Sequence, residues 1–248
     1  VGGGYIGLEM GSVWSRLGSE VHVVEFLDHI TPGMDKEISN EFMKILKKQG
    51  IKFHMQHKVE KITKKNSSAI VLTMDKDGNT KDFDCDVVLV SVGRKPNTEG
   101  LNLEKIGLNL DDKNRIQTDK NFKTNLENIY AIGDVVTTNR HTNVAAAHAS
   151  VVLKNILFKF PSKINTKIIP NTIYIEPELS QIGYTKKAAE KEFGSNNIIC
   201  VKHNFMTNDR NITDGNLDGL IHLVAKKNGV LLGATIFGPN AGELIQVC

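Results

Sequence analysis

Three glycines at the start of the chain, Gly2, Gly4 and Gly7, match the pattern G-x-G-x-x-G. This pattern is typical of the turn between a strand and a helix that holds a dinucleotide pyrophosphate. The first glycine permits the tight turn, the second lets phosphates approach the backbone, and the third lets the helix pack close to the sheet. The N–H groups at the helix N-terminus attract the phosphates. The predicted chemistry is therefore dinucleotide binding.

The residues after this turn predict the elements that such a site needs. A helix is expected from Leu8 to Leu17, with Gly18 at its C-terminus, and a strand over residues 21–24 leads to Glu25. Glu25 follows the glycines at close to the ~20-residue spacing at which an acid reaches the ribose 2′-OH. A carboxylate there would repel the 2′-phosphate of NADP, and no Arg lies between Glu25 and the next predicted helix. The sequence therefore predicts NAD over NADP.

Composition excludes several classes of protein. With 248 residues, one to two domains are expected, and the net charge of +3 is too small and scattered to indicate a nucleic-acid or membrane partner. No run approaches the ~18 apolar residues of a transmembrane helix. Cys85, Cys200 and Cys248 have neither zinc-ligand nor C-x-x-C spacing and are interpreted as reduced thiols, so no metal site is predicted. Only Val1 precedes the glycine turn, so the chain is interpreted as a fragment.

Periodicity predicts the remaining elements of the first part of the chain. An amphipathic helix over residues 34–49 ends at Gly50, and a strand follows at 51–53. Three short antiparallel strands are predicted at 59–62, 69–74 and 81–85, with a hairpin turn at Asp77-Gly78. The apolar run at 87–92 predicts a buried strand that returns to the parallel sheet.

The later part of the chain is predicted to change from an irregular, polar segment to an antiparallel sheet. A strand over residues 128–132 is expected to end at Gly133-Asp134, and a helix to run over about 143–158. Further strands and helices are predicted at 172–175, 185–193, 198–203, 220–225, 230–237 and 241–247.

Four blocks of sequence occur in one order along the chain. They are the glycine turn with Glu9 and Glu25, Ser91-Val-Gly-Arg-Lys-Pro-Asn97, Ile129-Tyr-Ala-Ile-Gly-Asp134, and residues 173–185 with Pro177-Glu178. The ordered set resembles the FAD/NAD-dependent pyridine nucleotide-disulfide oxidoreductases of class I. That family includes dihydrolipoamide dehydrogenase, glutathione reductase and mercuric reductase, and the similarity covers essentially the whole chain.

The resemblance implies an α/β fold in three parts. Residues 1–97 would form a Rossmann-like NAD-binding domain with an antiparallel β insertion and a truncated first strand. Residues 98–165 would form the returning, C-terminal part of an FAD-binding domain. Residues 166–248 would form a partial α+β dimerisation domain, so that a homodimer is expected.

The resemblance also adds residues to the nucleotide site. Tyr5 and Ile6 would line the nicotinamide pocket, and Glu9 would lie near the nicotinamide and pair with a flavin-domain lysine outside this segment. Val59 and Gly93 would offer backbone contacts to NAD. The set implied for NAD is Gly2, Gly4, Tyr5, Ile6, Gly7, Glu9, Glu25, Val59 and Gly93.

A second set of residues is implied for FAD. Asp134 would bind the ribityl chain, although an acid after a strand and a glycine is by itself more often a turn or cap residue. The helix that begins near Thr142, with Val144 in its first turn, would direct its N-terminus at the flavin ring. His141 and His148 are expected to be solvated, and Met10 and Trp14 to pack in a core or domain interface.

The catalytic groups of the family are expected outside this segment. They are a C-x-x-x-x-C pair in the flavin domain and a His-Glu pair near the C-terminus. The segment alone is therefore predicted to lack disulfide reductase activity and to hold FAD poorly. The parent protein would pass electrons between NADH and a disulfide through FAD, in the bacterial cytoplasm or the mitochondrial matrix.

Three functions stay open for the parent protein. Residues up to about 134 favour a dihydrolipoamide dehydrogenase, acting on lipoyl groups, with a 2-oxoacid dehydrogenase complex as one setting. The second alternative is a mercuric-reductase-like or other NAD(P)H-dependent flavoprotein reductase, because the segment from Asn208 to Gly215 is closer to mercuric-reductase-like proteins. The third alternative is a non-catalytic nucleotide-binding module that kept the fold and lost the redox pair.

Overall fold

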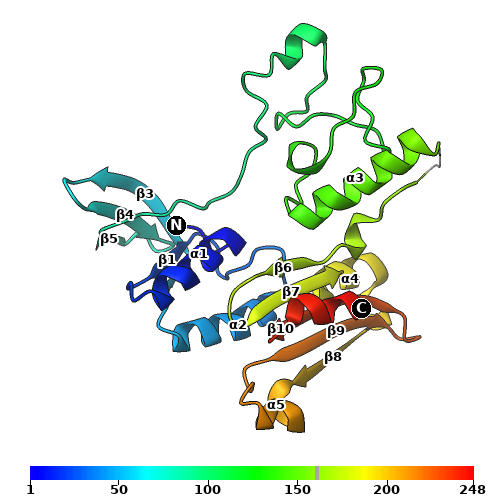
Figure 1. The fold of residues 1–248 in the computed structure, drawn as a ribbon. Helices are drawn as coiled ribbons and strands as arrows, with labels where there is room; N and C mark the ends of the chain where they lie inside the picture. The colour runs from blue at the N-terminus through cyan, green and yellow to red at the C-terminus, as the bar shows by residue number, and fades with distance from the viewer. Residues whose placement is uncertain (160–161) are drawn as a thin grey trace. The chain divides into compact units, whose positions relative to one another are not determined.

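The computed structural model describes residues 1–159 and 162–248, which form two compact units (Figure 1). One unit comprises residues 1–93 together with 170–248, and the other comprises 94–169. The first and the last segments of the chain therefore fold together, and the middle segment folds by itself.

The glycine turn opens the first unit and leads into a β-α-β arrangement. Helix α1 (Tyr5–Arg16) is followed by strand β1 (His22–Glu25), helix α2 (Lys36–Lys48) and strand β2 (Lys52–Met55). Strands β1 and β2 pair in parallel, as strands joined by a crossover helix do. The N–H of Gly2 donates to the carbonyl of Val24 at 2.8 Å, which fixes the turn beside the end of β1.

Helix α2 has the amphipathic pattern from which a helix is predicted in this region. Ile38, Phe42, Ile45 and Leu46 recur at helical spacing and all four are buried, while charged residues occupy the opposite face. Gly50 follows the helix with φ +94, a left-handed conformation that glycine adopts at little cost. The amphipathic helix was predicted at this place, and the structure confirms it.

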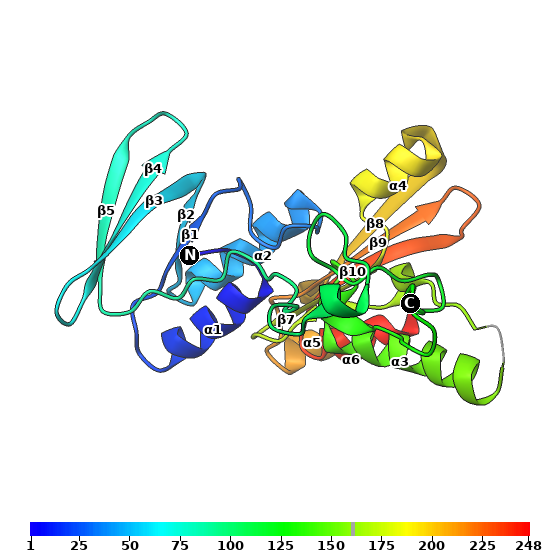
Figure 2. The ribbon, with the colours of Figure 1, turned by 90° about the horizontal axis from the view of Figure 1, so that it is seen from above.

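Strands β3 (His57–Lys64), β4 (Ala69–Asp75) and β5 (Thr80–Cys85) form a separate antiparallel sheet. Figure 2 shows this sheet extending beside β1 and β2. The Asp77-Gly78 hairpin joins β4 and β5, with Gly78 at φ +85. The predicted three-stranded insertion is therefore present.

The segment 87–92 is not the buried strand that its apolar run predicts. Val87 is 81% exposed, and the segment has no regular strand structure. Two backbone hydrogen bonds join this segment to Val1. The Val1 N–H donates to Leu89 O at 2.7 Å, and the Ser91 N–H donates to Val1 O at 2.8 Å. The segment joins none of the sheets formed by the described residues, and most of its side chains are exposed.

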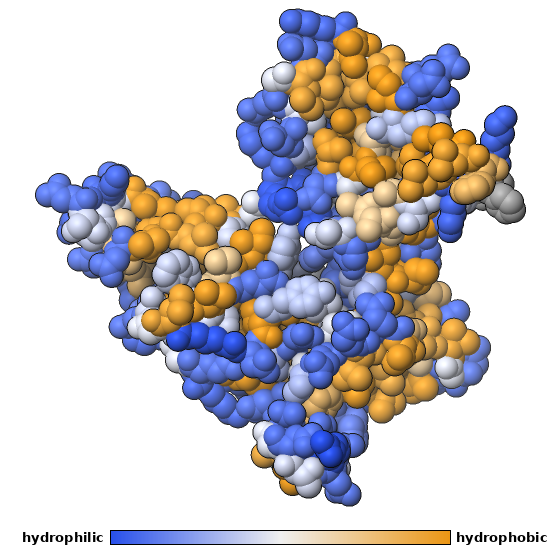
Figure 3. All heavy atoms as spheres, in the orientation of Figure 1, coloured by the Kyte–Doolittle hydropathy of each residue, from blue (hydrophilic) through white to orange (hydrophobic). Residues whose placement is uncertain are grey.

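The second unit is mostly irregular and contains one long helix, α3 (Thr142–Leu157). The strand predicted over residues 128–132 is absent, because only an isolated bridge between Lys123 and Tyr130 forms there. Two 3₁₀ helices, η1 (Leu103–Ile106) and η2 (Gly133–Val135), flank that segment. Figure 3 shows apolar side chains on the surface over α3, where Leu157 and Phe158 are exposed.

A five-stranded antiparallel sheet forms the C-terminal part of the first unit. Its strands in spatial order are β6 (Asn171–Ile173), β7 (Glu178–Gly183), β10 (Leu231–Gly238), β9 (Leu220–Lys226) and β8 (Ile198–Asn204). Strand β7 was missed by sequence reasoning, although it lies between β6 and β10. It carries the buried polar residues Ser180 and Gln181, which interrupt the apolar pattern of a strand.

Short helices connect and cover this sheet. They are α4 (Lys186–Phe193), α5 (Asp209–Thr213) and α6 (Ala241–Leu244), with 3₁₀ helices η4 (Ser195–Asn197), η5 (Phe205–Thr207) and η6 (Ile245–Val247). The 3₁₀ helix η3 (Thr166–Ile168) belongs to the second unit. Helix α4 was predicted, and Thr185 caps it by accepting a hydrogen bond from the Ala188 N–H at 3.1 Å. Helix α5 was not predicted.

The main core of the first unit joins both of its segments. Leu8, Ile38, Phe42 and Leu46 from the first segment pack in one cluster with Leu179 and other residues of the C-terminal sheet. Met10 and Trp14 are not in this core but exposed on α1, so core packing is wrong for them, and packing in a domain interface stays a prediction.

Candidate functional site

The glycine turn is built so tightly that two of its positions admit only glycine. A Cβ added to Gly7 would lie 2.1 Å from the carbonyl oxygen of Gly2, and a Cβ added to Gly2 would lie 2.6 Å from that of Ser91. Gly2 also has φ +104. Helix α1 can therefore begin directly against the turn.

Gly4 differs from these two glycines, because a Cβ added to it would meet nothing within 4 Å. Gly4 is the N-cap of α1, and the first turn of α1, Tyr5–Leu8, carries no acidic side chain. A helix N-terminus bears about half a positive charge, which favours an anion. Open space at the one glycine that faces this charge fits the pyrophosphate of a dinucleotide.

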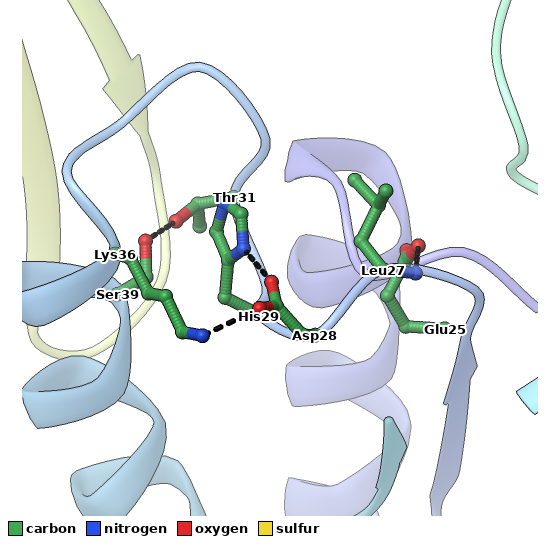
Figure 4. Close-up of polar contacts among 7 residues, drawn as sticks. All are labelled: Glu25, Leu27, Asp28, His29, Thr31, Lys36 and Ser39. Atoms are coloured by element: carbon green, nitrogen blue, oxygen red, sulfur yellow. Dashed lines mark hydrogen bonds and ion pairs between the residues drawn. The ribbon is translucent and has the colours of Figure 1, made fainter. Parts of the chain in front are cut away.

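The carboxylate of Glu25 lies at the same turn, held by two backbone amides. Its Oε2 accepts a hydrogen bond from the Gly3 N–H at 2.6 Å, and its Oε1 accepts one from the Leu27 N–H at 2.8 Å (Figure 4). Glu25 is 9% exposed. A charged acceptor fixed in this way is suited to bind hydroxyl groups and to exclude a second anion.

An ionic cluster follows Glu25 on the loop to α2. Asp28 contacts both His29 and Lys36, the first residue of α2 (Figure 4). The hydrogen bond from Lys36, with a smaller contribution from His29, lowers the pKa of Asp28 to about 2. The nearest cation after Glu25 is thus already paired with an acid, and sequence reasoning did not identify this pair.

The other residues expected at the NAD site are dispersed over the first unit. Tyr5 and Ile6 are half-buried in the first turn of α1, and Val59 is half-buried on β3. Gly93 is exposed with φ +134. The Glu9 Oε1 accepts a hydrogen bond from the Tyr174 N–H at 2.9 Å, and its pairing with a lysine outside this segment stays a prediction.

The residues expected at the FAD site lie in the second unit. Asp134 is in η2, and its Oδ2 lies 2.8 Å from a guanidinium nitrogen of Arg94. Thr142 is the first residue of α3 and is exposed, whereas the side chain of Val144 is fully buried. The Val144 N–H donates to His141 O at 3.1 Å and to Asn143 Oδ1 at 3.0 Å, so this amide is already used within the helix start.

His148 is not solvated, which corrects the expectation from sequence. It is 2% exposed, and its ring stacks on Phe122 with centroids 4.1 Å apart. Its Nδ1 accepts a hydrogen bond from the Gly133 N–H at 3.2 Å, so Nδ1 carries no proton. Burial lowers the pKa of His148. The residue preceding Asp134 is therefore held by a neutral imidazole, while His141 is half-buried.

The described residues contain neither a metal-binding cluster nor a membrane-spanning helix. Across residues 1–159 and 162–248, no group of three or more His, Cys, Asp or Glu side chains is arranged to hold a metal ion. In the same part of the chain, the longest apolar helices are too short or too polar to cross a membrane. Cys85, Cys200 and Cys248 are free thiols.

Comparison with protein families matches nearly the whole chain. The model described as pyridine nucleotide-disulphide oxidoreductase matches residues 1–150. The model of the dimerisation domain of the same family matches residues 169–248.

Curated relatives are similar over the full chain. A mitochondrial dihydrolipoyl dehydrogenase of Dictyostelium discoideum is 40% identical over 252 residues, which cover 100% of this chain and 51% of the relative. A leghemoglobin reductase of Glycine max is 39% identical, covering 99% of this chain and 47% of the relative. The chain thus spans about half the length of the curated relatives it matches.

Solved structures share the fold. The HOCl-induced flavoprotein disulfide reductase RclA of Escherichia coli, as its Cu(II) complex, superposes with a TM-score of 0.88 at 24% identity, over 100% of this chain and 55% of that one. LpdA of Mycobacterium tuberculosis superposes with a TM-score of 0.86 at 25% identity, over 99% of this chain and 53% of that one. The α/β fold class expected from sequence is confirmed.

Proposed function

Because the chain belongs to the pyridine nucleotide-disulphide oxidoreductase family, we propose that it forms the NAD-binding part of a flavoprotein oxidoreductase that acts on a dithiol or disulfide. The observation that carries this proposal is the pair formed by Gly4 and Glu25. Open space at Gly4 lies at the N-terminus of α1, and a buried carboxylate is fixed at the same turn. Together they fit the pyrophosphate and the adenosine ribose of one dinucleotide.

The electrostatics of this site favour NAD over NADP. The carboxylate of Glu25 can accept hydrogen bonds from ribose hydroxyls, but it would oppose a 2′-phosphate. Lys36 contacts Asp28 and is therefore not an unpaired cation available to the phosphate. Tyr5, Ile6, Glu9, Val59 and Gly93 complete the proposed NAD site on the strength of the family pattern.

For FAD, we assign Asp134 and the start of α3 at Thr142 as the parts of this chain that would hold it. Val144, whose side chain is buried and whose N–H is bonded within the helix start, is kept in the site from the family pattern alone. When bound, the flavin supplies two-electron transfer between the nicotinamide and a disulfide. Asp134 offers a carboxylate to hydroxyl groups of the ribityl chain, and Arg94 holds that carboxylate in place. The start of α3 offers the partial positive charge of a helix N-terminus. The three cysteines of this chain are free and far apart in sequence, so the chain's own role is to bind and orient cofactors.

We further propose dihydrolipoamide as the substrate and a homodimer as the working form. The names of the 37–40% identical relatives support the substrate, and the match to a dimerisation domain supports the dimer. Membership of a 2-oxoacid dehydrogenase complex stays a prediction. The division into residues 1–97, 98–165 and 166–248 also stays a prediction.

The first test is a titration of the chain with NADH and with NADPH, in which binding is measured by nicotinamide fluorescence. NADPH is expected to bind at least about tenfold more weakly, which corresponds to about 1.4 kcal/mol. Equal dissociation constants for the two dinucleotides would contradict the NAD preference. No binding of either one would contradict the proposed function.

A further inference from the structure

Thr31 has a backbone conformation that is disfavoured both by its own β-branched side chain and by the proline that follows it. It has φ +53, in the left-handed region, where a β-branched residue is an outlier. It also precedes Pro32, and a proline restricts the residue before it to extended conformations. Something in the fold must therefore hold Thr31 in place, and such outliers often mark functional positions.

Three hydrogen bonds hold this residue. The Thr31 N–H donates to the carbonyl oxygen of Gly3 at 2.9 Å, and the Thr31 carbonyl accepts from the Met34 N–H at 3.1 Å. The Thr31 hydroxyl lies 2.6 Å from the hydroxyl of Ser39 on α2 (Figure 4). Thr31 is 3% exposed and Ser39 is fully buried, so each hydroxyl would lose its partner if the other were removed.

The bond to Gly3 reaches the centre of the nucleotide turn. The Gly3 N–H donates to Glu25 Oε2 at 2.6 Å while the Gly3 carbonyl accepts from Thr31, so both polar groups of Gly3 are fixed. The peptide bond between Gly3 and Gly4 is trans. In a trans peptide the N–H points opposite to the C=O, so the bond from Thr31 sets the direction of the Gly4 N–H. Gly4 is the glycine with open space around its Cα.

We propose that Thr31 is a positioning residue for dinucleotide binding. The buried hydroxyl pair of Thr31 and Ser39 holds Thr31 in its left-handed conformation, and Thr31 in turn orients the Gly3–Gly4 peptide toward the pyrophosphate. This inference rests on the proposed function, because it assigns a ligand to the same turn. Thr31 touches no ligand itself, and it acts through Gly3.

Two substitutions at Thr31 distinguish the backbone from the side chain. Thr31→Val keeps the shape but removes the hydroxyl, so the left-handed conformation loses its support. Thr31→Gly removes the whole side chain, but glycine adopts positive φ freely and keeps the N–H. If conformation is what matters, Thr31→Val weakens NADH binding about tenfold, and Thr31→Gly weakens it less than about threefold. If side-chain packing matters, Thr31→Gly is the worse variant.

The same reasoning predicts the effects of substitutions at Ser39. Ser39→Ala is expected to weaken NADH binding about as much as Thr31→Val, and the double variant no more than either single one. Ser39→Ala in the Thr31→Gly background is expected to have no further effect. Thr124→Val is a matched control: it removes another buried hydroxyl, which donates to Ile129 O at 3.0 Å in the other unit. This control is expected to leave the NADH dissociation constant unchanged.

The test measures NADH binding by fluorescence and hydrogen exchange of the residue-31 amide in the ligand-free chain. Protection of that amide is expected to be lost in Thr31→Val and kept in Thr31→Gly. Unchanged NADH binding in Thr31→Val, or weaker binding in Thr31→Gly than in Thr31→Val, would overturn the inference alone. A wild-type chain that binds no NADH would overturn the proposed function and this inference together, whereas the exchange data would still report whether Thr31 holds Gly3.

Discussion

Phe42 on α2 packs against Phe237 on β10, with ring centroids 5.8 Å apart and ring planes at 51°. Phe42 is fully buried, and Phe237 nearly so. This contact joins the nucleotide-binding segment to the C-terminal sheet, although the two residues are far apart in the sequence. The helix that follows Glu25 is therefore anchored by the C-terminal sheet.

Replacement of Phe42 by alanine is expected to destabilise the whole first unit. Loss of a buried phenylalanine in a core costs about 3–5 kcal/mol, which includes the cavity it leaves. Urea unfolding of the variant should therefore show a lower midpoint for the nucleotide segment and the C-terminal sheet together. The exposed Trp14 on α1 provides the control, because Trp14→Ala should change stability by only about 0.5 kcal/mol. A loss below about 1 kcal/mol in Phe42→Ala would contradict the shared core.

Alanine at Gly4 should impair NADH binding, whereas alanine at Gly7 should impair stability. Gly4→Ala places its Cβ in open space, so stability should change little, while NADH binding should fall at least about tenfold because the methyl group occupies the phosphate position. Gly7→Ala places its Cβ 2.1 Å from the Gly2 carbonyl oxygen and should destabilise the chain by about 1–3 kcal/mol. Thermal unfolding and NADH titration of both variants separate the two effects. Tight NADH binding by Gly4→Ala would exclude Gly4 from the phosphate site.

Glu25→Gln should weaken both the fold and NADH binding. Both oxygens of Glu25 accept backbone N–H groups, and the amide nitrogen of glutamine cannot accept either bond. One buried N–H would lose its acceptor, at a cost of about 1–3 kcal/mol, measured by urea unfolding. Glu178→Gln is the control, since its bond from the Gly242 N–H can be kept by the amide oxygen and Glu178 lies outside the proposed NAD site. Equal effects of the two substitutions on stability and on NADH binding would contradict the role of Glu25 at the turn.

The stability of the second unit is expected to fall in mild acid because of His148. Burial lowers the pKa of His148 in the folded state. Below its ordinary pKa of about 6.5, the unfolded chain takes up a proton that the folded chain does not, so the free energy of unfolding decreases as the pH falls, by up to about 1.4 kcal/mol per pH unit. The effect is absent above about pH 7, where both states are neutral.

His148→Asn is the matched variant for this prediction. The side-chain oxygen of asparagine can accept the Gly133 N–H in place of Nδ1, but it does not titrate. Thermal unfolding between pH 7 and pH 5 should therefore show a shallower dependence on pH in this variant. Burial also lowers the pKa of His54 and His222, so part of the pH dependence should remain. If thermal unfolding depends on pH equally in the variant and the wild type, His148 does not contribute to the loss of stability in acid.

The sequence alone was sufficient wherever the determining residues are close together along the chain. The three glycines, the distance from them to Glu25 and the apolar face of α2 could all be read directly, because a missing Cβ or a helical period is a local property. The order of four motifs was sufficient to indicate the family. The hairpin strands β4, β5, β9 and β10 were predicted for the same reason, since turn residues mark them.

Only the tertiary structure decided what each residue meets from elsewhere in the chain. The apolar run at 87–92 is exposed because it joins none of the sheets formed by the described residues, and β7 is buried although its residues include polar ones. His148 is buried because Phe122 and Gly133 pack on it. Thr31 reaches Gly3 across 28 positions of sequence through a conformation that its own residue type disfavours. Such contacts depend on packing between distant segments, and no local pattern records them.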